Sequence, residues 1–68
     1  MKLIDVLNAM CSTAEAKVSG WNWKTKAEFC RIGNRTYFKN HPEWNDFEVE
    51  HLFAMNGTIC IEVILEKV

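Results

Sequence analysis

The side chains best suited to bind a metal are three cysteines and two histidines: Cys11, Cys30, Cys60, His41 and His51. Thiolate sulfur and imidazole nitrogen are the ligands that zinc prefers. Structural zinc sites usually bring them in close pairs such as Cys-x-x-Cys, and no such pair occurs here. A free cysteine within an apolar pattern, as at Cys11 and Cys60, behaves as a small hydrophobic residue. The sequence therefore predicts no metal and no cofactor.

Nucleophilic catalysis would need a thiol beside a base. Cys30 and His51 could form such a pair if the fold joined them. However, the sequence shows no glycine-rich oxyanion turn and no Asn or Asp that would orient the histidine. Glu48 and Glu50 would share one face of a strand, but acid–base catalysis needs a cleft that raises a carboxyl pKa. We predict no catalytic residues and a protein that is not an enzyme.

Acidic residues gather in the segment 43–50, at Glu43, Asp46, Glu48 and Glu50. Over the whole chain, eight Lys and Arg oppose nine Asp and Glu, so the net charge of −1 argues against bulk binding of nucleic acid. Charge polarised in this way steers association with an oppositely charged protein. We predict that these carboxylates form a partner-binding face, which meets a basic groove as phosphates would.

Aromatic and basic residues alternate in a second segment and supply an alternative site: Trp21, Trp23, Lys24, Lys26 and, further along, Arg35. Indole rings can stack on bases while cations hold phosphates, so this set would suit the capture of a nucleotide signal. A chain this small also needs its large side chains in the core. The sequence leaves open whether Trp21 and Trp23 are core or surface.

Length and composition limit the architecture. Sixty-eight residues allow one domain, residues 1–68. Hydrophobic residues make up 49% of the chain and charged residues 25%, which is a globular composition. The apolar stretch from Leu3 to Cys11 is too short, and too interrupted by Asp5 and Asn8, for a secretion signal or a membrane span. The odd number of widely spaced cysteines indicates reduced thiols in a cytoplasm.

The first third of the chain predicts a helix followed by extended chain. An apolar stripe at helical spacing is formed by Leu3, Val6, Leu7 and Met10. Ser12-x-x-Glu15 has the pattern of a capping box, which predicts a restarted turn of helix. A short strand is expected around residues 16–19.

The middle third predicts a hairpin. Gly33-Asn34 suits a two-residue turn between strands at residues 25–32 and 35–40. In that register Phe29 faces Phe38, as an aromatic cross-strand pair would. Pro42 ends the second strand because proline donates nothing to a ladder. Residues 43–46 then form a turn or one turn of helix.

The last third has two interpretations up to Met55. Phe47, Val49, His51, Phe53 and Met55 alternate as a strand would, whereas Trp44, Phe47, Leu52 and Met55 fit a ragged helix. Asn56-Gly57 between apolar runs favours a hairpin. The last strand, residues 58–68, then carries Ile59, Ile61, Val63 and Leu65 on one face.

The predicted fold is α+β: one N-terminal helix packed on a four- to five-stranded antiparallel sheet. We expect the helix to cover the apolar face of the last strand. If that strand lies at an edge, it could pair with a second copy, so monomer and homodimer both remain open.

Both ends of the chain resemble a known group. Residues 1–8, Met-Lys-Leu-Ile-Asp-Val-Leu-Asn, and the strand at residues 56–66 resemble the ends of short hypothetical proteins encoded by phages and prophages of Gram-positive bacteria. The middle of the chain, with Trp21, Trp23 and His41-Pro42, departs from their pattern. The resemblance implies a phage accessory protein in the cytoplasm of a bacterial host, and it transfers no catalytic residue.

Some small phage proteins of that setting inhibit host defences, anti-CRISPR proteins among them. By analogy, the leading expectation is a stoichiometric inhibitor of a host antiviral protein such as a CRISPR effector. Its partner would be a host protein, such as a nuclease, with no direct nucleic-acid ligand and no membrane. Two alternatives remain: a sponge that sequesters a nucleotide signal, and a small transcriptional or structural accessory factor.

Overall fold

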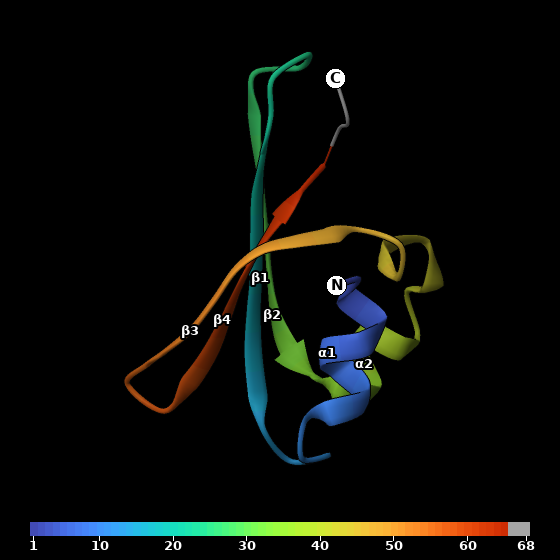
Figure 1. The fold of residues 1–68 in the computed structure, drawn as a ribbon, viewed down its shortest axis with the longest axis vertical. Coiled ribbons are helices and arrows are strands. Elements are labelled where there is room, and N and C mark those ends of the chain that lie inside the picture. The colour runs from blue at the N-terminus through green and yellow to red at the C-terminus, as the bar shows by residue number, and fades with distance from the viewer. Residues whose placement is uncertain (66–68) are drawn as a thin grey trace.

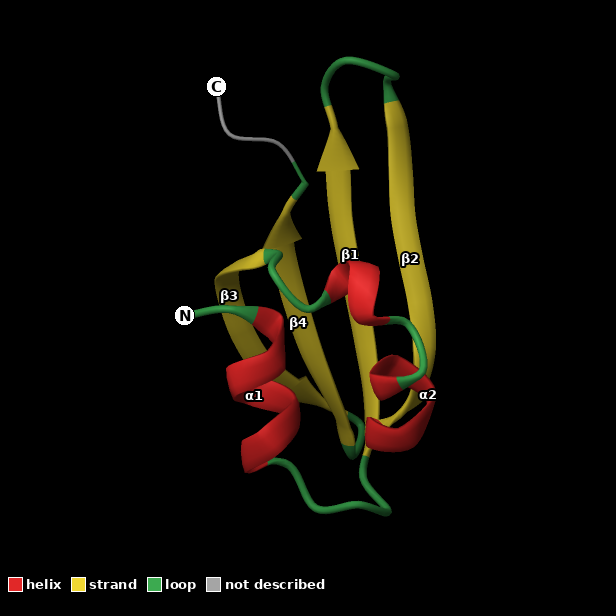
Figure 2. Cartoon of the chain, turned by 90° about the vertical axis from the view of Figure 1, so that its right-hand side faces the viewer, coloured by secondary structure: helices red, strands yellow, loops and turns green. Residues whose placement is uncertain are grey.

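A computed structural model of the chain describes residues 1–65. The elements in order are α1 (Leu3–Ala9), β1 (Glu15–Asn22), β2 (Ala27–Asn34), α2 (Arg35–Lys39), the 3₁₀ helix η1 (Pro42–Trp44), β3 (Glu48–Met55) and β4 (Thr58–Ile64). The helices form one layer against one face of a four-stranded sheet (Figures 1 and 2). The predicted α+β fold is confirmed. Residues 66–68, at the end of the predicted last strand, lie outside the described part.

The sheet is mixed, with strand order β2-β1-β4-β3. Both hairpins are antiparallel, but β1 runs parallel to β4, with Val18 opposite Ile61. The expectation of a wholly antiparallel sheet was therefore wrong. The two central strands supply the buried sheet residues, and the more polar β2 and β3 take the edges, where water reaches them. Because β4 is internal, it offers no open edge for pairing with a second copy.

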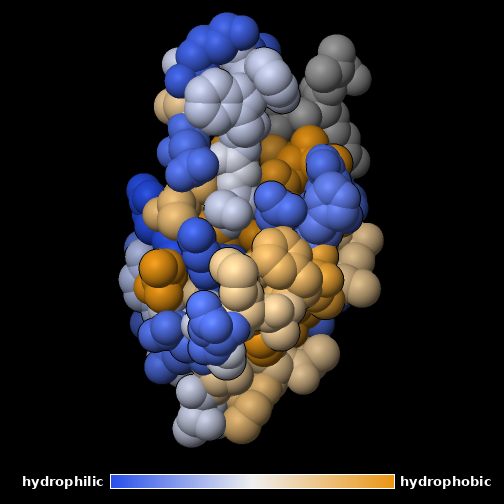
Figure 3. Space-filling view, turned by 90° about the vertical axis from the view of Figure 1, so that its left-hand side faces the viewer, coloured by the Kyte–Doolittle hydropathy of each residue, from blue (hydrophilic) through white to orange (hydrophobic). Residues whose placement is uncertain are grey.

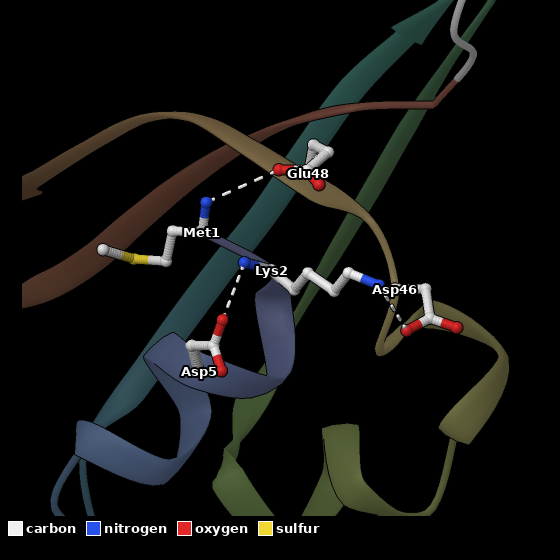
Figure 4. Close-up of polar contacts among 5 residues, drawn as sticks. All are labelled: Met1, Lys2, Asp5, Asp46 and Glu48. Atoms are coloured by element: carbon white, nitrogen blue, oxygen red, sulfur yellow. Dashed lines mark hydrogen bonds and ion pairs between the residues drawn. The ribbon is translucent and has the colours of Figure 1, made fainter.

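The core lies between α1, α2 and the central strands. Its buried members are Leu3, Val6, Leu7, Met10, Ala16, Val18, Phe38, Ile61 and Val63. The helix packs on the predicted face of β4: Ile61 and Val63 belong to this core, and Ile59 and Leu65 pack against it. At the start of α1 the backbone N–H of Lys2 donates to the Asp5 carboxylate at 3.0 Å (Figure 4). The capping box predicted at Ser12 does not form, since Glu15 begins β1.

The predicted hairpin at Gly33-Asn34 was wrong, together with its Phe29–Phe38 pair. Asn34 ends β2 and caps α2, because its side-chain oxygen accepts from the backbone N–H of Tyr37 at 2.9 Å. A Cβ on Gly33 would lie 2.5 Å from Cδ2 of Tyr37, so glycine lets that ring lie against the strand. Asparagine is as favourable at a helix N-cap as in a turn. The helix cap is the conformation that forms, because it allows Phe38 of α2 to be buried in the core.

The true partner of β2 is β1, through a turn at residues 23–26. The side-chain oxygen of Asn22 accepts from the backbone N–H groups of Lys24 (3.0 Å) and Thr25 (3.2 Å). Lys26 adopts a positive φ of 56°. An Asn side chain that bonds the next backbone amides is a known turn device. This was the signal that the sequence interpretation missed, and β1 accordingly extends well beyond the predicted residues 16–19.

The hairpin at Asn56-Gly57 is confirmed. Asn56 has a φ of 53° and Gly57 a φ of 78°. A two-residue turn of this kind requires positive φ at both positions. The turn or single turn of helix predicted at residues 43–46 is confirmed: residues 43–44 end η1, and residues 45–46 form a turn.

A register shift between Val49 and His51 alters the predicted alternation of β3. Val49 pairs with Val63 of the core, whereas His51 pairs with Glu62. The two β3 residues therefore face opposite sides of the sheet.

Candidate functional site

The sheet face away from the helices, here called the open face, carries exposed apolar side chains. Among the described residues, no helix or strand covers it (Figures 1 and 3). One row across the four strands runs Ile32, Lys17, Cys60 and Phe53. Ile32 is 56% exposed and Phe53 46%, and Ile64 of β4 is 39% exposed. The hydrophobic residues gather over the middle and lower part of this face in Figure 3.

All four predicted acidic residues have nearby cationic or imidazole partners. Glu43 lies 3.2 Å from Nδ1 of His41, and Asp46 lies 3.4 Å from Nζ of Lys2. The N-terminal amine lies 3.5 Å from the Glu48 carboxylate (Figure 4). The backbone N–H of Glu43 itself, helped by His41, lowers the pKa of the Glu43 carboxyl. These three carboxylates therefore have part of their charge offset within the chain.

Glu50 belongs to a different group. It lies at the register shift of β3, 3.6 Å from Nδ1 of His51, and that nitrogen lies 3.4 Å from Glu62 of β4. The structure thus joins Glu50 to Glu62 through a shared imidazole. Sequence reasoning did not select Glu62 as a site residue, because only the register between β3 and β4 brings it beside Glu50.

Trp21 and Trp23 are surface residues. Trp21 is 43% and Trp23 69% exposed, and their ring centroids are 5.9 Å apart with planes at 77°. Nζ of Lys26 lies 5.3 Å from the ring centroid of Trp23. The tryptophan that packs inside is Trp44, whose ring stacks on His41 at 4.3 Å and meets Phe29 edge-on.

A pocket of about 410 Å³ joins the tryptophans to the second acidic pair. It is lined by Gly20, Trp21, Trp23, Glu50, Glu62, Val63 and Ile64. Of the residues predicted to hold a nucleotide, Trp21, Trp23, Lys24 and Lys26 share the β1–β2 hairpin. Arg35 lies beyond the other end of β2, where its guanidinium donates to the carbonyl oxygen of Met10 at 3.0 Å. The structure therefore separates Arg35 from the rest of that set.

The cysteines and histidines do not gather within residues 1–65, where no three potential metal ligands come together. Cys30 lies on one edge strand and His51 on the other, so the two central strands separate this thiol from this imidazole. Cys11 is exposed and Cys60 buried. Hydrogen bonding from the Thr13 hydroxyl is the main cause that lowers the pKa of the Cys11 thiol.

A second hollow of about 380 Å³ runs between α1 and the β3–β4 hairpin. Its lining is apolar and consists of Val6, Ala9, Met10, Leu52, Phe53, Ala54 and Ile59. No charged side chain of the described residues lines it, so it offers a hydrophobic surface without a polar group to orient a ligand.

Within the described residues, no helix combines the length and the apolar character that crossing a membrane requires. Comparison of the chain with protein-family models, curated protein sequences and solved structures gave no significant match.

Proposed function

We propose that this chain is a non-enzymatic phage accessory protein that acts by stoichiometric binding to a host protein. In this proposal it inhibits an antiviral defence protein such as a CRISPR effector. The phage setting comes from the resemblance of the two chain ends. The observation that carries the binding function is the open face, where apolar side chains lie exposed on a sheet.

A small domain can spare few apolar side chains from its core. Exposing Ile32, Phe53 and Ile64 on one face, with Met55 nearby, is therefore better explained by a partner than by chance. Charged residues lie among these side chains: Lys17 stands between Ile32 and Cys60 in the row across the strands, and Glu62 precedes Ile64 on the same face of β4. Protein–protein interfaces combine exposed apolar side chains with polar and charged ones in this way.

The position of the open face determines which carboxylates we expect a bound partner to contact. All of these carboxylates, Glu50 and Glu62 included, have partners within the chain, but Glu50 and Glu62 are the ones that line the pocket beside Trp21. We therefore assign the acidic contact with a basic groove to Glu50 and Glu62, which lie beside the exposed Ile64.

The test is a DNA-cleavage assay with a purified CRISPR effector and its guide RNA, titrated with the chain. We expect cleavage to stop near one equivalent, because a stoichiometric inhibitor does not turn over. Phe53→Ser should weaken inhibition about tenfold or more, as for an interface hot spot. Leu52→Ser is the matched control, because Leu52 is 51% exposed on the other face of the same strand.

Thermal unfolding of each variant shows whether it is folded at the assay temperature. Full cleavage at a tenfold molar excess of the folded wild-type chain would contradict the inhibitor function. Equal inhibition by wild type and Phe53→Ser would contradict the assignment to the open face.

The nucleotide sponge remains a second candidate, because Trp21, Trp23, Lys24 and Lys26 share one hairpin. Glu50 and Glu62 weaken it, since they line the same pocket as the tryptophans and would repel a phosphate. Tryptophan fluorescence titrated with nucleotides tests it: a sponge responds at micromolar ligand, and an inhibitor that binds only protein does not. No feature of the described residues favours a transcriptional or structural accessory role.

A further inference from the structure

We propose that the pocket formed by Trp21, Trp23, Glu50 and Glu62 binds an arginine side chain of the partner protein. The presence of a partner rests on the proposed function. The recognition chemistry of the pocket rests on its own residues and can be tested without any partner.

The aromatic part of the pocket is suited to a cation. The two indole rings stand at 77° to each other, so they form two walls of one corner. Tryptophan is the aromatic side chain whose ring face attracts cations most strongly. Lys26 already places its ammonium 5.3 Å from the Trp23 centroid, which shows such a contact at this hairpin within the chain itself.

The acidic part of the pocket attracts cations and repels anions. Glu50 and Glu62 lie on either side of the His51 imidazole, at 3.6 and 3.4 Å. Two carboxylates around one imidazole carry net negative charge whether the ring is neutral or protonated. A cation that enters the corner therefore meets carboxylate oxygens as well as ring faces, whereas a phosphate or a carboxylate is repelled.

Hydration and hydrogen-bond geometry favour guanidinium over ammonium in this pocket. The pocket is open to water, and an ammonium ion is strongly hydrated there, whereas guanidinium is more weakly hydrated. A planar guanidinium can lie against one indole face and donate two parallel N–H groups to a carboxylate. The volume of about 410 Å³ is large enough for a guanidinium group.

The test uses the full ¹⁵N-labelled chain and small probes followed by NMR. The chain has three tryptophans, so each indole N–H signal can be assigned. With N-acetyl-arginine amide, we expect saturable shifts of the Trp21 and Trp23 signals at millimolar concentration. Trp44 packs in the helix layer and serves as an internal reference that should not move. Shifts of all three signals together, or of none, would overturn the proposal.

Two matched probes separate charge from shape. The citrulline analogue has nearly the shape of arginine without the charge, and we expect it to shift Trp21 and Trp23 at least about fivefold less at equal concentration. Equal shifts would mean stacking without cation recognition and would overturn the proposal. The lysine analogue should bind more weakly than arginine, and equal or tighter binding would overturn the choice of guanidinium.

Variants connect the response to the carboxylates. Replacing both by amides, Glu50→Gln with Glu62→Gln, should weaken arginine binding about fivefold or more while the chain stays folded. Glu43→Gln, which removes a carboxylate outside the pocket, should bind arginine as the wild type does. Equal binding by all three proteins would overturn the role of the pocket carboxylates.

Failure of the pocket and failure of the proposed function can be told apart. If arginine binds but the chain does not inhibit the effector, the pocket stands and the function falls. If the chain inhibits the effector but Trp21 and Trp23 do not respond to arginine, the function stands and the pocket proposal falls.

Discussion

Gly20 of β1 approaches Val63 of β4 so closely that a Cβ on Gly20 would lie 2.6 Å from the Val63 carbonyl oxygen. The same Cβ would lie 3.1 Å from Cγ of Leu65. Just before this point the parallel pairing of β1 with β4 ends, at Ser19 with Glu62. The absence of a side chain at Gly20 therefore lets the end of β4 lie against β1 beside the tryptophan pocket.

Gly20→Ala should lower the free energy of unfolding by about 1–3 kcal/mol, because backbone atoms must move to admit the methyl group. Chemical denaturation measures the change. Ser19→Ala, one residue earlier on the open face, is the control and should change stability by less than about 0.5 kcal/mol. A Gly20→Ala protein as stable as wild type would contradict this close approach.

Asn34→Ala should destabilise the protein by about 1 kcal/mol, because the backbone N–H of Tyr37 loses its side-chain acceptor. Asn34→Asp retains an acceptor and should restore most of the loss. Urea unfolding followed by tryptophan fluorescence measures both. An Asn34→Ala protein as stable as the wild type would contradict the helix cap.

Phe38→Ala should cost about 3–5 kcal/mol, because the side chain is fully buried beside α1. A small domain has little more stability than that in total, so most of the chain should unfold at room temperature. Circular dichroism against temperature checks this. Phe38→Leu keeps most of the buried volume and should stay folded. A folded Phe38→Ala protein would place Phe38 outside the core.

Cys11 should react with iodoacetamide faster than Cys30 or Cys60, because it is exposed and hydrogen bonding from Thr13 lowers its pKa. A lower pKa means that more of the thiol is thiolate at a given pH, so alkylation begins at lower pH. Thr13→Ala should raise this pKa and slow alkylation about threefold near neutral pH. At high pH the two rates should converge, as mass spectrometry of the labelled peptides would show. An unchanged pH profile would contradict the role of Thr13.

Local patterns in the sequence were sufficient for the elements that depend on local chemistry. The spacing of Leu3, Val6, Leu7 and Met10 predicted α1 and its buried side. Asn56-Gly57 predicted the β3–β4 turn, because few residue pairs adopt two consecutive positive φ angles. Alternation in β4 predicted which side chains meet the helix. For the site, the sequence identified Trp21, Trp23 and Glu50 without showing that they belong together.

Tertiary structure decided between conformations that the local sequence allows equally well. Gly33-Asn34 suits a turn or the end of a strand with a helix cap, and burial of Phe38 selects the cap. The parallel pairing of β1 with β4 depends on how two hairpins pack under one helical layer, and neither hairpin encodes it. The register shift in β3 then places Glu50 near Glu62 and the two tryptophans. Pairing between strands distant in the chain lowers the free energy only once the fold has formed, so no local pattern reveals it.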